Sequence, residues 1–387
     1  MAELYSNLTR VAFPLVINGY FGILGAETEW ALWILAFATI TLTVVFWHKI
    51  HIHNFRNVFM RVSLLILSNV LIVASVGISI NRAGTFYASW GDLFGLQSNL
   101  KQIAIAPENL ALITKKDLQS TKKTNAGSLI FKKVITGQDS GISGRVIVVM
   151  TPKLVNEIKH SKNYSLGNDY QVVELFPGYP GVPETWIGAL KGLDAIEKME
   201  QDNKIPPTIA VIPSINVVPG LDTECLNIPG TSDVETWLTA DMKTFAQRFI
   251  GIDDRKWSAF GYSTGGWCAA ELGVRHQDQF GSAVSLAGYF SPTFSAGVTS
   301  SERTVLKNEY DLVATLKSNP NTLQMLAIYS RQNDFETKSL FEFKNKVSDV
   351  LALKTIEIPE GGHNIKTWQP YVYTGFEWIA SLAASGH

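Results

Sequence analysis

Two long stretches without a charged residue restrict what this 387-residue chain can fold into. Residues 30–47 (WALWILAFATITLTVVFW) and 62–80 (VSLLILSNVLIVASVGISI) contain no Asp, Glu, Lys or Arg. Each is about long enough to cross a hydrocarbon core roughly 30 Å thick. We therefore predict two transmembrane helices, within an N-terminal membrane region that covers residues 1–82.

A third apolar stretch, residues 11–26, is shorter and contains Pro14, Asn18 and three glycines. The sequence leaves open whether it spans the membrane, re-enters it or lies at its surface. A cleavable signal peptide is disfavoured, because the N-terminus carries the acidic Glu3 and lacks a basic leading region.

The loop between the two predicted spans is basic, with Lys49, Arg56 and Arg61, whereas Glu27 and Glu29 lie at the other end of the first span. Cytoplasmic loops of membrane proteins carry an excess of Lys and Arg, which places this loop in the cytoplasm. The sequence therefore predicts a multi-pass protein of the cell membrane whose C-terminal part is extracytoplasmic.

Strand and helix patterns alternate through that C-terminal part. The strand candidates are residues 128–136, 143–150, 171–176, 208–215, 256–260, 281–287, 323–329 and 353–358, and the helix candidates are 184–200, 233–250, 264–277, 335–349 and 365–383. Such alternation is typical of a mostly parallel α/β sheet with helices on both faces, here opened by an antiparallel hairpin. We expect this domain over residues 127–387, joined to the membrane region by a juxtamembrane tether, residues 83–126.

A serine between two glycines follows the fifth strand candidate, where residues 258–268 read SAFGYSTGGWC. A nucleophile elbow turns from strand to helix so tightly that positions two residues before and after the serine have no room for a Cβ. Gly261 and Gly265 occupy those positions around Ser263. We therefore predict that Ser263 is a nucleophile.

Partners for Ser263 are expected in loops at the carboxyl ends of the strands, where open parallel sheets bind ligands. His363 lies in such a loop, PEGGHN, and a neutral imidazole is the usual general base for a serine hydroxyl. The preceding strand-end loop, RQNDFE, offers Asp334 as the preferred acid and Glu336 as the alternative. The order serine, acid, histidine is that of the α/β hydrolases.

A tetrahedral intermediate also needs hydrogen-bond donors for its oxyanion. One backbone amide should come from Thr264, the residue after the nucleophile. The other should come from the loop LFPGYPGVPETW, in which Gly178 and Gly181 free the backbone to turn, so we predict the Tyr179 amide.

These motifs resemble the esterase D and enterochelin-esterase branch of the α/β hydrolases, which includes the mycobacterial mycolyltransferases. The resemblance rests on FGYSTGGWCAA, the GYPG loop, Asp334 and GGHNIKTW, and it covers roughly residues 127–383. The stretch before GDLFG, the segment DTEC at 222–225 and the WLTADM stretch further resemble membrane-anchored esterase-like proteins of actinobacteria. Many esterases of this branch carry His at the position of Pro177, and the transferase relatives use Glu as the acid, which supports Glu336.

Several other residues are candidates for the site or its walls. They are Asp222 and Glu224, for substrate binding or as surface charges, and Trp186, Trp237, Trp267 and Trp368, for a pocket lining or for the core. The two cysteines, Cys225 and Cys268, fit either one disulfide that braces the active-site wall or two free buried thiols.

The resemblance and the motifs together predict a membrane-tethered serine esterase that acts through an acyl-enzyme. Two alternatives remain, an acyltransferase acting on a sugar or lipid hydroxyl and an inactive binding module with the same fold. The expected partner is an acyl ester, such as an envelope lipid or glycolipid. The net charge of −1 and the lack of a long basic run give no indication of nucleic-acid binding.

We predict no cofactor and no metal. The cluster His48, His51 and His53 fits a polar loop at a membrane surface and lacks Cys, Asp or Glu among its members. The sequence makes no prediction about the oligomeric state.

Overall fold

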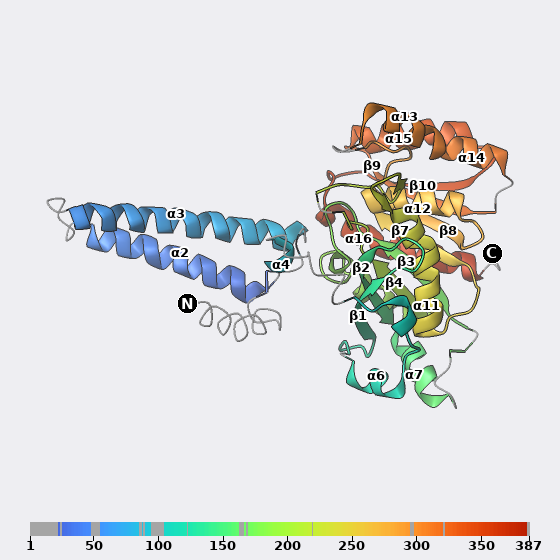
Figure 1. The fold of residues 1–387 in the computed structure, drawn as a ribbon, viewed down its shortest axis with the longest axis horizontal. Coiled ribbons are helices and arrows are strands. Elements are labelled where there is room, and N and C mark those ends of the chain that lie inside the picture. The colour runs from blue at the N-terminus through green and yellow to red at the C-terminus, as the bar shows by residue number, and fades with distance from the viewer. Residues whose placement is uncertain are drawn as a thin grey trace. The chain divides into compact units, whose positions relative to one another are not determined.

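The structure is a computed structural model that describes residues 22–23, 25–47, 55–84, 87, 90–93, 104–121, 123–161, 166–167, 169–218, 220–294, 298–319 and 322–384. The chain forms two compact units, residues 1–97 and 98–387 (Figure 1). Most of the third apolar stretch, residues 11–26, lies outside the described residues, as does the histidine cluster 48–53. The two units are considered separately.

The first unit contains a hairpin of two long helices, α2 (Ala26–Phe46) and α3 (Phe55–Gly84), followed by the short α4 (Trp90–Leu93). Glu29, near the start of α2, forms an ion pair with Arg82, near the end of α3, so the helices run antiparallel. Within the described residues, both helices are long and apolar enough to cross a membrane.

Small hydroxyl side chains lie between these two helices, whereas large apolar side chains cover their outer faces. Thr39 and Thr43 of α2 and Ser68 and Ser75 of α3 are buried, and each hydroxyl donates to the carbonyl four residues earlier. Because these hydroxyls are satisfied within their own helix, they can be buried without a partner from water.

A sheet of eight strands forms the centre of the second unit. Its strands are β1 (Leu129–Thr136), β2 (Ser143–Met150), β3 (Gln171–Phe176), β4 (Thr208–Pro213), β7 (Trp257–Tyr262), β8 (Phe280–Leu286), β9 (Gln324–Ser330) and β10 (Ala352–Ile358). The order across the sheet is β1-β2-β4-β3-β7-β8-β9-β10. β2 is antiparallel to both β1 and β4, and the remaining neighbours are parallel. The expected α/β fold with an antiparallel hairpin at its start is confirmed.

Helices cover both faces of this sheet, as Figure 1 shows. They are α6 (Lys115–Ser120), α7 (Pro152–His160), α8 (Glu184–Ile187), α9 (Gly192–Gln201), α10 (Val234–Thr236), the π-helical turn η3 (Trp237–Asp241), α11 (Met242–Ile250), α12 (Thr264–Arg275), α13 (Ser300–Glu309), α14 (Leu312–Ser318), α15 (Asp334–Val347) and α16 (Ile365–Ala384). A 3₁₀ turn, η2 (Pro107–Asn109), and a two-stranded ribbon, β5 (Asn227–Ile228) with β6 (Ser232–Asp233), complete the unit.

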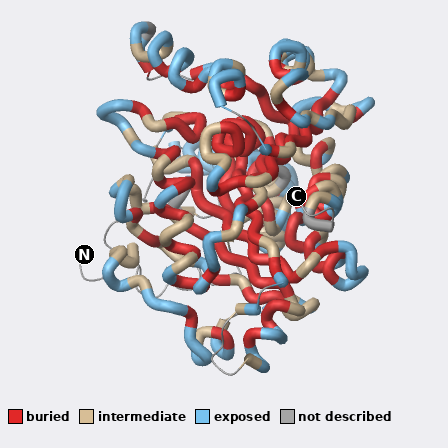
Figure 2. The backbone as a smooth tube through the Cα atoms, turned by 90° about the vertical axis from the view of Figure 1, so that its right-hand side faces the viewer, coloured by how far each residue is buried: buried red, intermediate tan, exposed pale blue. Residues whose placement is uncertain are grey.

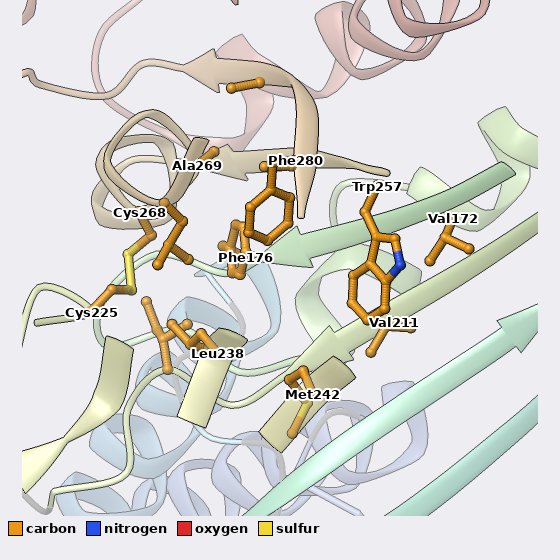
Figure 3. Packing of buried hydrophobic residues seen from close by; sticks show 14 of the residues in the cluster. Val172, Phe176, Val211, Cys225, Leu238, Met242, Trp257, Cys268, Ala269 and Phe280 are labelled. Carbon is orange, nitrogen blue, oxygen red and sulfur yellow. A yellow bond between two sulfur atoms is a disulfide. The ribbon is translucent and has the colours of Figure 1, made fainter. Parts of the chain in front are cut away.

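The core has two halves, because side chains alternate between the faces of a strand. Val173 and Leu175 of β3 pack in the half covered by α9 and α16. Val172 and Phe176 pack in the other half, which α11, α12 and α15 cover. Figure 2 shows that the buried residues lie in the interior of the unit. Figure 3 shows the packing around Phe176 and Trp257 in the half of the core that α11, α12 and α15 cover.

Two expected helices are interrupted in the structure. The segment 184–200 divides into α8 and α9, because Gly192 must approach the Trp186 ring and Lys191 adopts a left-handed conformation with φ 53°. The segment 233–250 contains a π-helical turn between α10 and α11. That turn buries both Trp237, which donates to the Ser214 carbonyl, and Asp241.

Part of the segment expected to be a tether packs on the second unit. Ile105 pairs with Ile135 of β1, and Ile113 and Leu118 are buried in the core half that contains α11. The structure therefore places residues 105–121 with the sheet.

Glu174, in the middle of β3, is fully buried, and neither carboxylate oxygen has a hydrogen-bond partner among the described residues. Burial raises the pKa of this carboxyl well above its usual value. The unfolded chain releases the proton at about pH 4.5, but the folded chain keeps it to a higher pH. The free energy of unfolding therefore falls by up to about 1.4 kcal/mol per pH unit between those two pKa values.

We expect Glu174→Gln to remove this pH dependence. Its melting temperature in detergent should exceed that of the wild type at pH 8, and the difference should shrink at pH 5. Glu309→Gln, at an exposed position at the end of α13, is the matched control. Equal differences at both pH values would contradict a protonated Glu174.

Candidate active site

Ser263 lies in the turn between β7 and α12, with φ 55° and ψ −125°. Such a conformation is strained for a residue with a side chain and is typical of functional sites. The Ser263 N–H donates to the Leu286 carbonyl of β8 at 2.9 Å, which fixes the turn. A Cβ at Gly261 would overlap the Gly265 carbonyl, and one at Gly265 would overlap the Phe176 carbonyl. The strand-turn-helix expected around Ser263 is therefore present, and glycine is required at both flanking positions.

Hydrogen bonds connect three side chains: Ser263 from the turn before α12, Glu336 from the first turn of α15 and His363 from the loop after β10. The Ser263 Oγ lies 2.7 Å from His363 Nε2, and His363 Nδ1 lies 2.6 Å from Glu336 Oε1. Glu336 is 1% exposed, whereas the His363 side chain is 41% exposed. One edge of the imidazole thus faces a buried carboxylate and the other faces the serine hydroxyl, in a site open to solvent.

The acid that contacts His363 is Glu336, not the preferred Asp334. Asp334 is the first residue of α15 and is exposed, whereas Glu336, two residues later, is buried beneath the imidazole. Successive positions of a helix point in different directions, so only one of these two carboxylates can face the histidine. The geometry corrects our preference and favours the alternative.

Three residues that hold Glu336 and the histidine loop escaped the sequence analysis. Asn333 Nδ2 donates to Glu336 Oε1 at 2.6 Å and lies 3.3 Å from His363 Nδ1, while the Ser330 N–H donates to Glu336 Oε2 at 3.0 Å. Ser330 Oγ donates to the Gly361 carbonyl, and the Gly361 N–H donates to Gln332 at 3.1 Å. The signal for Asn333 is visible in the sequence, because Asn followed three residues later by Glu is a helix-capping pattern.

The loop after β3 lies against the nucleophile turn. A Cβ built on Gly178 would lie 3.1 Å from the Ser263 Cβ and 3.0 Å from the Tyr262 ring, so a larger residue here would press on the nucleophile turn. Asn216 Nδ2 donates to the carbonyls of Gly178, at 3.2 Å, and Gly181. Tyr179 is half-buried between them. The loop that we expect to supply the second oxyanion donor is therefore beside Ser263 and held by Asn216.

Thr264 is the first residue of α12. The first N–H groups of a helix have no acceptor inside it, so the Thr264 amide is available to a ligand. Its side-chain hydroxyl donates to Asp222 Oδ2 at 3.1 Å. Asp222 is therefore next to the predicted oxyanion hole, and burial raises the pKa of its carboxyl to about 6.

Glu224 and Trp267, which the sequence allowed either as substrate contacts or as structural residues, pack into the wall behind the site. Glu224 is 2% exposed, and its carboxylate accepts hydrogen bonds from the Thr293 N–H, the Thr293 hydroxyl and the Phe294 N–H. Trp267 is fully buried, stacks on Tyr289, and donates from Nε1 to the Glu224 carbonyl at 2.9 Å. Their polar atoms are thus occupied by the protein itself.

The remaining tryptophans belong to the core as well. Trp186 and Trp237 are fully buried. Trp368, 4% exposed, contacts the His363 ring edge to face with centroids 4.6 Å apart. Trp368 therefore packs against the histidine ring, and among the four tryptophans it is the one whose ring contacts a side chain of the site.

A disulfide joins Cys225 to Cys268, with Cα atoms 5.6 Å apart (Figure 3). It connects the segment after β4 to the second turn of α12, five residues beyond Ser263. Within the part of the chain that the structure describes, no group of three or more His, Cys, Asp or Glu side chains could hold a metal ion.

A family model described as "Putative esterase" matches residues 158–378, which is more than half of the chain and includes all three hydrogen-bonded side chains. The chain belongs to this esterase family. The expected resemblance to the esterase branch of the α/β hydrolases is thereby confirmed, and carboxylic ester hydrolysis is the reaction class that the family supports.

Individual relatives of this esterase are distant. An uncharacterized protein of Corynebacterium glutamicum is 24% identical over an alignment 227 residues long. The alignment covers 54% of this chain and about half, 52%, of that relative's length. Among solved structures, a ferulic acid esterase matches with a TM-score of 0.54 and 17% identity, covering 66% of this chain and 98% of its own. An S-formylglutathione hydrolase from Agrobacterium tumefaciens matches with a TM-score of 0.52 and 14% identity, covering 68% and 98%. These structural matches establish the α/β-hydrolase fold.

Proposed function

We propose that this chain is a serine esterase in which Ser263, His363 and Glu336 form the catalytic triad. The observation that carries the proposal is the chain of hydrogen bonds from Ser263 Oγ through the imidazole to a buried carboxylate, at 2.7 and 2.6 Å. The strained backbone at Ser263 and the adjacent α12 N-terminus support it. This arrangement fits acyl transfer, since it joins an activated nucleophile to amides that can bind an oxyanion.

In the proposed mechanism each group has one task. His363 Nε2 takes the hydroxyl proton as Ser263 Oγ bonds to the ester carbonyl carbon, and the carbonyl oxygen becomes an oxyanion near the Thr264 and Tyr179 amides. The imidazolium then gives its proton to the leaving alkoxide, which departs as an alcohol and leaves an acyl-enzyme. Water, deprotonated by the same imidazole, then bonds to the acyl carbon. The bond to Ser263 Oγ breaks, the acid is released, and the imidazolium returns its proton to Ser263 Oγ. Glu336 accepts the hydrogen bond from Nδ1–H throughout and stays ionised.

An acyltransferase is the second candidate. The imidazole is open to solvent, with 41% of its side chain exposed, so an alcohol can reach the position that hydrolytic water occupies. Product analysis with and without added sugar or lipid alcohols separates the two reactions. If the ester of the added alcohol is the sole product and no free acid forms, the hydrolase is excluded.

The primary test is labelling by a fluorophosphonate and hydrolysis of p-nitrophenyl butyrate by the full-length protein in membranes. We expect Ser263→Ala to abolish both, because the serine oxygen is the nucleophile. Ser348→Ala, an exposed serine at the end of α15, should retain both. Persistent labelling of Ser263→Ala, or no labelling of a folded wild type, would refute the proposal.

We further propose that the hairpin of α2 and α3 anchors the enzyme in the cell membrane, with the second unit outside the cytoplasm. Support comes from the length and composition of both helices and from the basic loop between them. A phosphatase reporter fused to the C-terminus should be active only when it is outside. If a reporter that works only in the cytoplasm is active at the same position, the second unit lies inside and the proposed orientation is wrong.

A further inference from the structure

Asp222 connects the wall of the site to the residue that follows the nucleophile. Its Oδ2 accepts a hydrogen bond from the Thr264 hydroxyl at 3.1 Å, and its Oδ1 accepts the Glu224 N–H at 3.0 Å. Thr264 is covalently bonded to Ser263, and its amide is one of the two proposed oxyanion donors. A side chain that orients Thr264 therefore acts on the oxyanion hole.

The segment that carries Asp222 is rigidly attached to α12. Glu224 accepts the Trp267 Nε1–H through its backbone carbonyl, and Cys225 is joined to Cys268. Both attachments are in the first two turns of the helix that begins at Thr264. These two attachments hold the segment that carries Asp222 against the start of α12.

The surroundings of Asp222 are acidic. Burial raises the pKa of Asp222 to about 6 and the carboxylate of Glu224 raises it too, while hydrogen bonds from Glu224 N–H and Thr264 oppose the shift. Tyr289, from the segment after β8, also interacts with Glu224 and Thr264. The site thus has a carboxylate that titrates near neutral pH beside the place where negative charge develops.

We propose that Asp222 is a positioning residue of the oxyanion hole. Its carboxyl group holds Thr264 in place, and when ionised it repels the negative charge of the tetrahedral intermediate. The proposal rests on the proposed esterase function. When Asp222 is protonated, it still bonds to Thr264 but carries no charge. When it is ionised, its negative charge raises the energy of the nearby oxyanion, so the chemical step is slowed.

Asp222→Asn tests the proposal, because the amide keeps the shape of the carboxyl without its charge: Oδ1 can still accept the Glu224 N–H, and the NH₂ group can donate to the Thr264 hydroxyl oxygen. For p-nitrophenyl butyrate and the full-length protein in detergent, we expect kcat at pH 8 to rise about threefold to tenfold, with KM nearly unchanged. The pH profile of kcat should also lose an ionisation near pH 6 that the wild type shows. Asp349→Asn, which removes a remote exposed charge, should behave as the wild type.

Thr264→Val provides a second, independent variant. It removes the hydrogen bond that stabilises the ionised carboxylate, so the ionisation should move to higher pH. An unchanged or lower kcat at pH 8 in Asp222→Asn, with a wild-type pH profile, would overturn the proposal. Ser263→Ala, measured under the same conditions, tests the proposed esterase function separately from the role of Asp222. Activity that survives this substitution refutes the esterase function itself.

Discussion

Glu336→Gln should lower kcat/KM for ester hydrolysis by about 10³- to 10⁴-fold, whereas Asp334→Asn should leave it within about twofold of the wild type. The glutamine cannot stabilise the imidazolium, and its NH₂ group would favour the wrong tautomer of His363. The carboxylate that it replaces lies 2.6 Å from His363 Nδ1 and is 1% exposed. The two carboxylates are two residues apart, so the pair controls for effects on helix α15 itself.

Kinetics in the two single variants and in the double variant measure this directly. A large loss in Asp334→Asn with little change in Glu336→Gln would show that the loop after β9 rearranges in solution. Melting temperatures should accompany the kinetics. They separate a loss of catalysis from a loss of the fold, because the Glu336 carboxylate also accepts hydrogen bonds from Asn333 and Ser330.

Gly261→Ala should destabilise the protein by more than about 4 kcal/mol, which corresponds to a fall in melting temperature of roughly 10 °C or more. The new methyl group would overlap the backbone carbonyl of Gly265 and lie 2.9 Å from the Gly266 nitrogen, and these backbone atoms cannot rotate aside as a side chain can. Thermal unfolding in detergent, followed by circular dichroism, checks the result.

Gly281→Ala in the neighbouring strand β8 is the control. Its methyl group would lie 3.5 Å from the Lys256 side chain, an ordinary van der Waals contact. We expect a change of less than about 1 kcal/mol. Equal destabilisation in both variants would indicate that any side chain in this sheet is harmful, and the tight turn would not be the cause.

The sheet could be predicted from the sequence because its central strands are buried on both faces. Such strands are continuous apolar, β-branched runs, and β2 and β3 begin and end at the predicted residues. Helices α13 and α14 were not predicted. Helix α14 is only 7 residues long and packs against α12 and α15, and no local pattern records such contacts.

The hydrogen-bonded pair of Ser263 and His363 could be anticipated because each residue lies in a local motif. Ser263 needs glycines at fixed positions, and His363 is in a glycine-rich loop after the last strand. The acid could not be chosen by residue type, since Asp and Glu serve equally well. It is decided by the helix start, where Asn333 caps α15 and turns Glu336 back toward the strand ends.

The roles of the tryptophans and of Glu224 could not be predicted for a different reason. Aromatic and acidic side chains occur both in pockets and in cores, and only the packing of distant segments separates the two cases. Glu224 is buried because the segment after β8 supplies three donors to it, from residues about 70 positions away in the sequence.

The members of the proposed triad follow strands at different positions in the sheet, one central and one at the edge. Ser263 follows β7, which has neighbours on both sides, whereas the His363 loop follows β10, the edge strand, whose residues are largely only half-buried. Edge strands fray at lower free energies than central ones. Activity can therefore be lost while the sheet around Ser263 is still folded, and an activity assay in denaturant should report a lower stability than amide hydrogen exchange in β7.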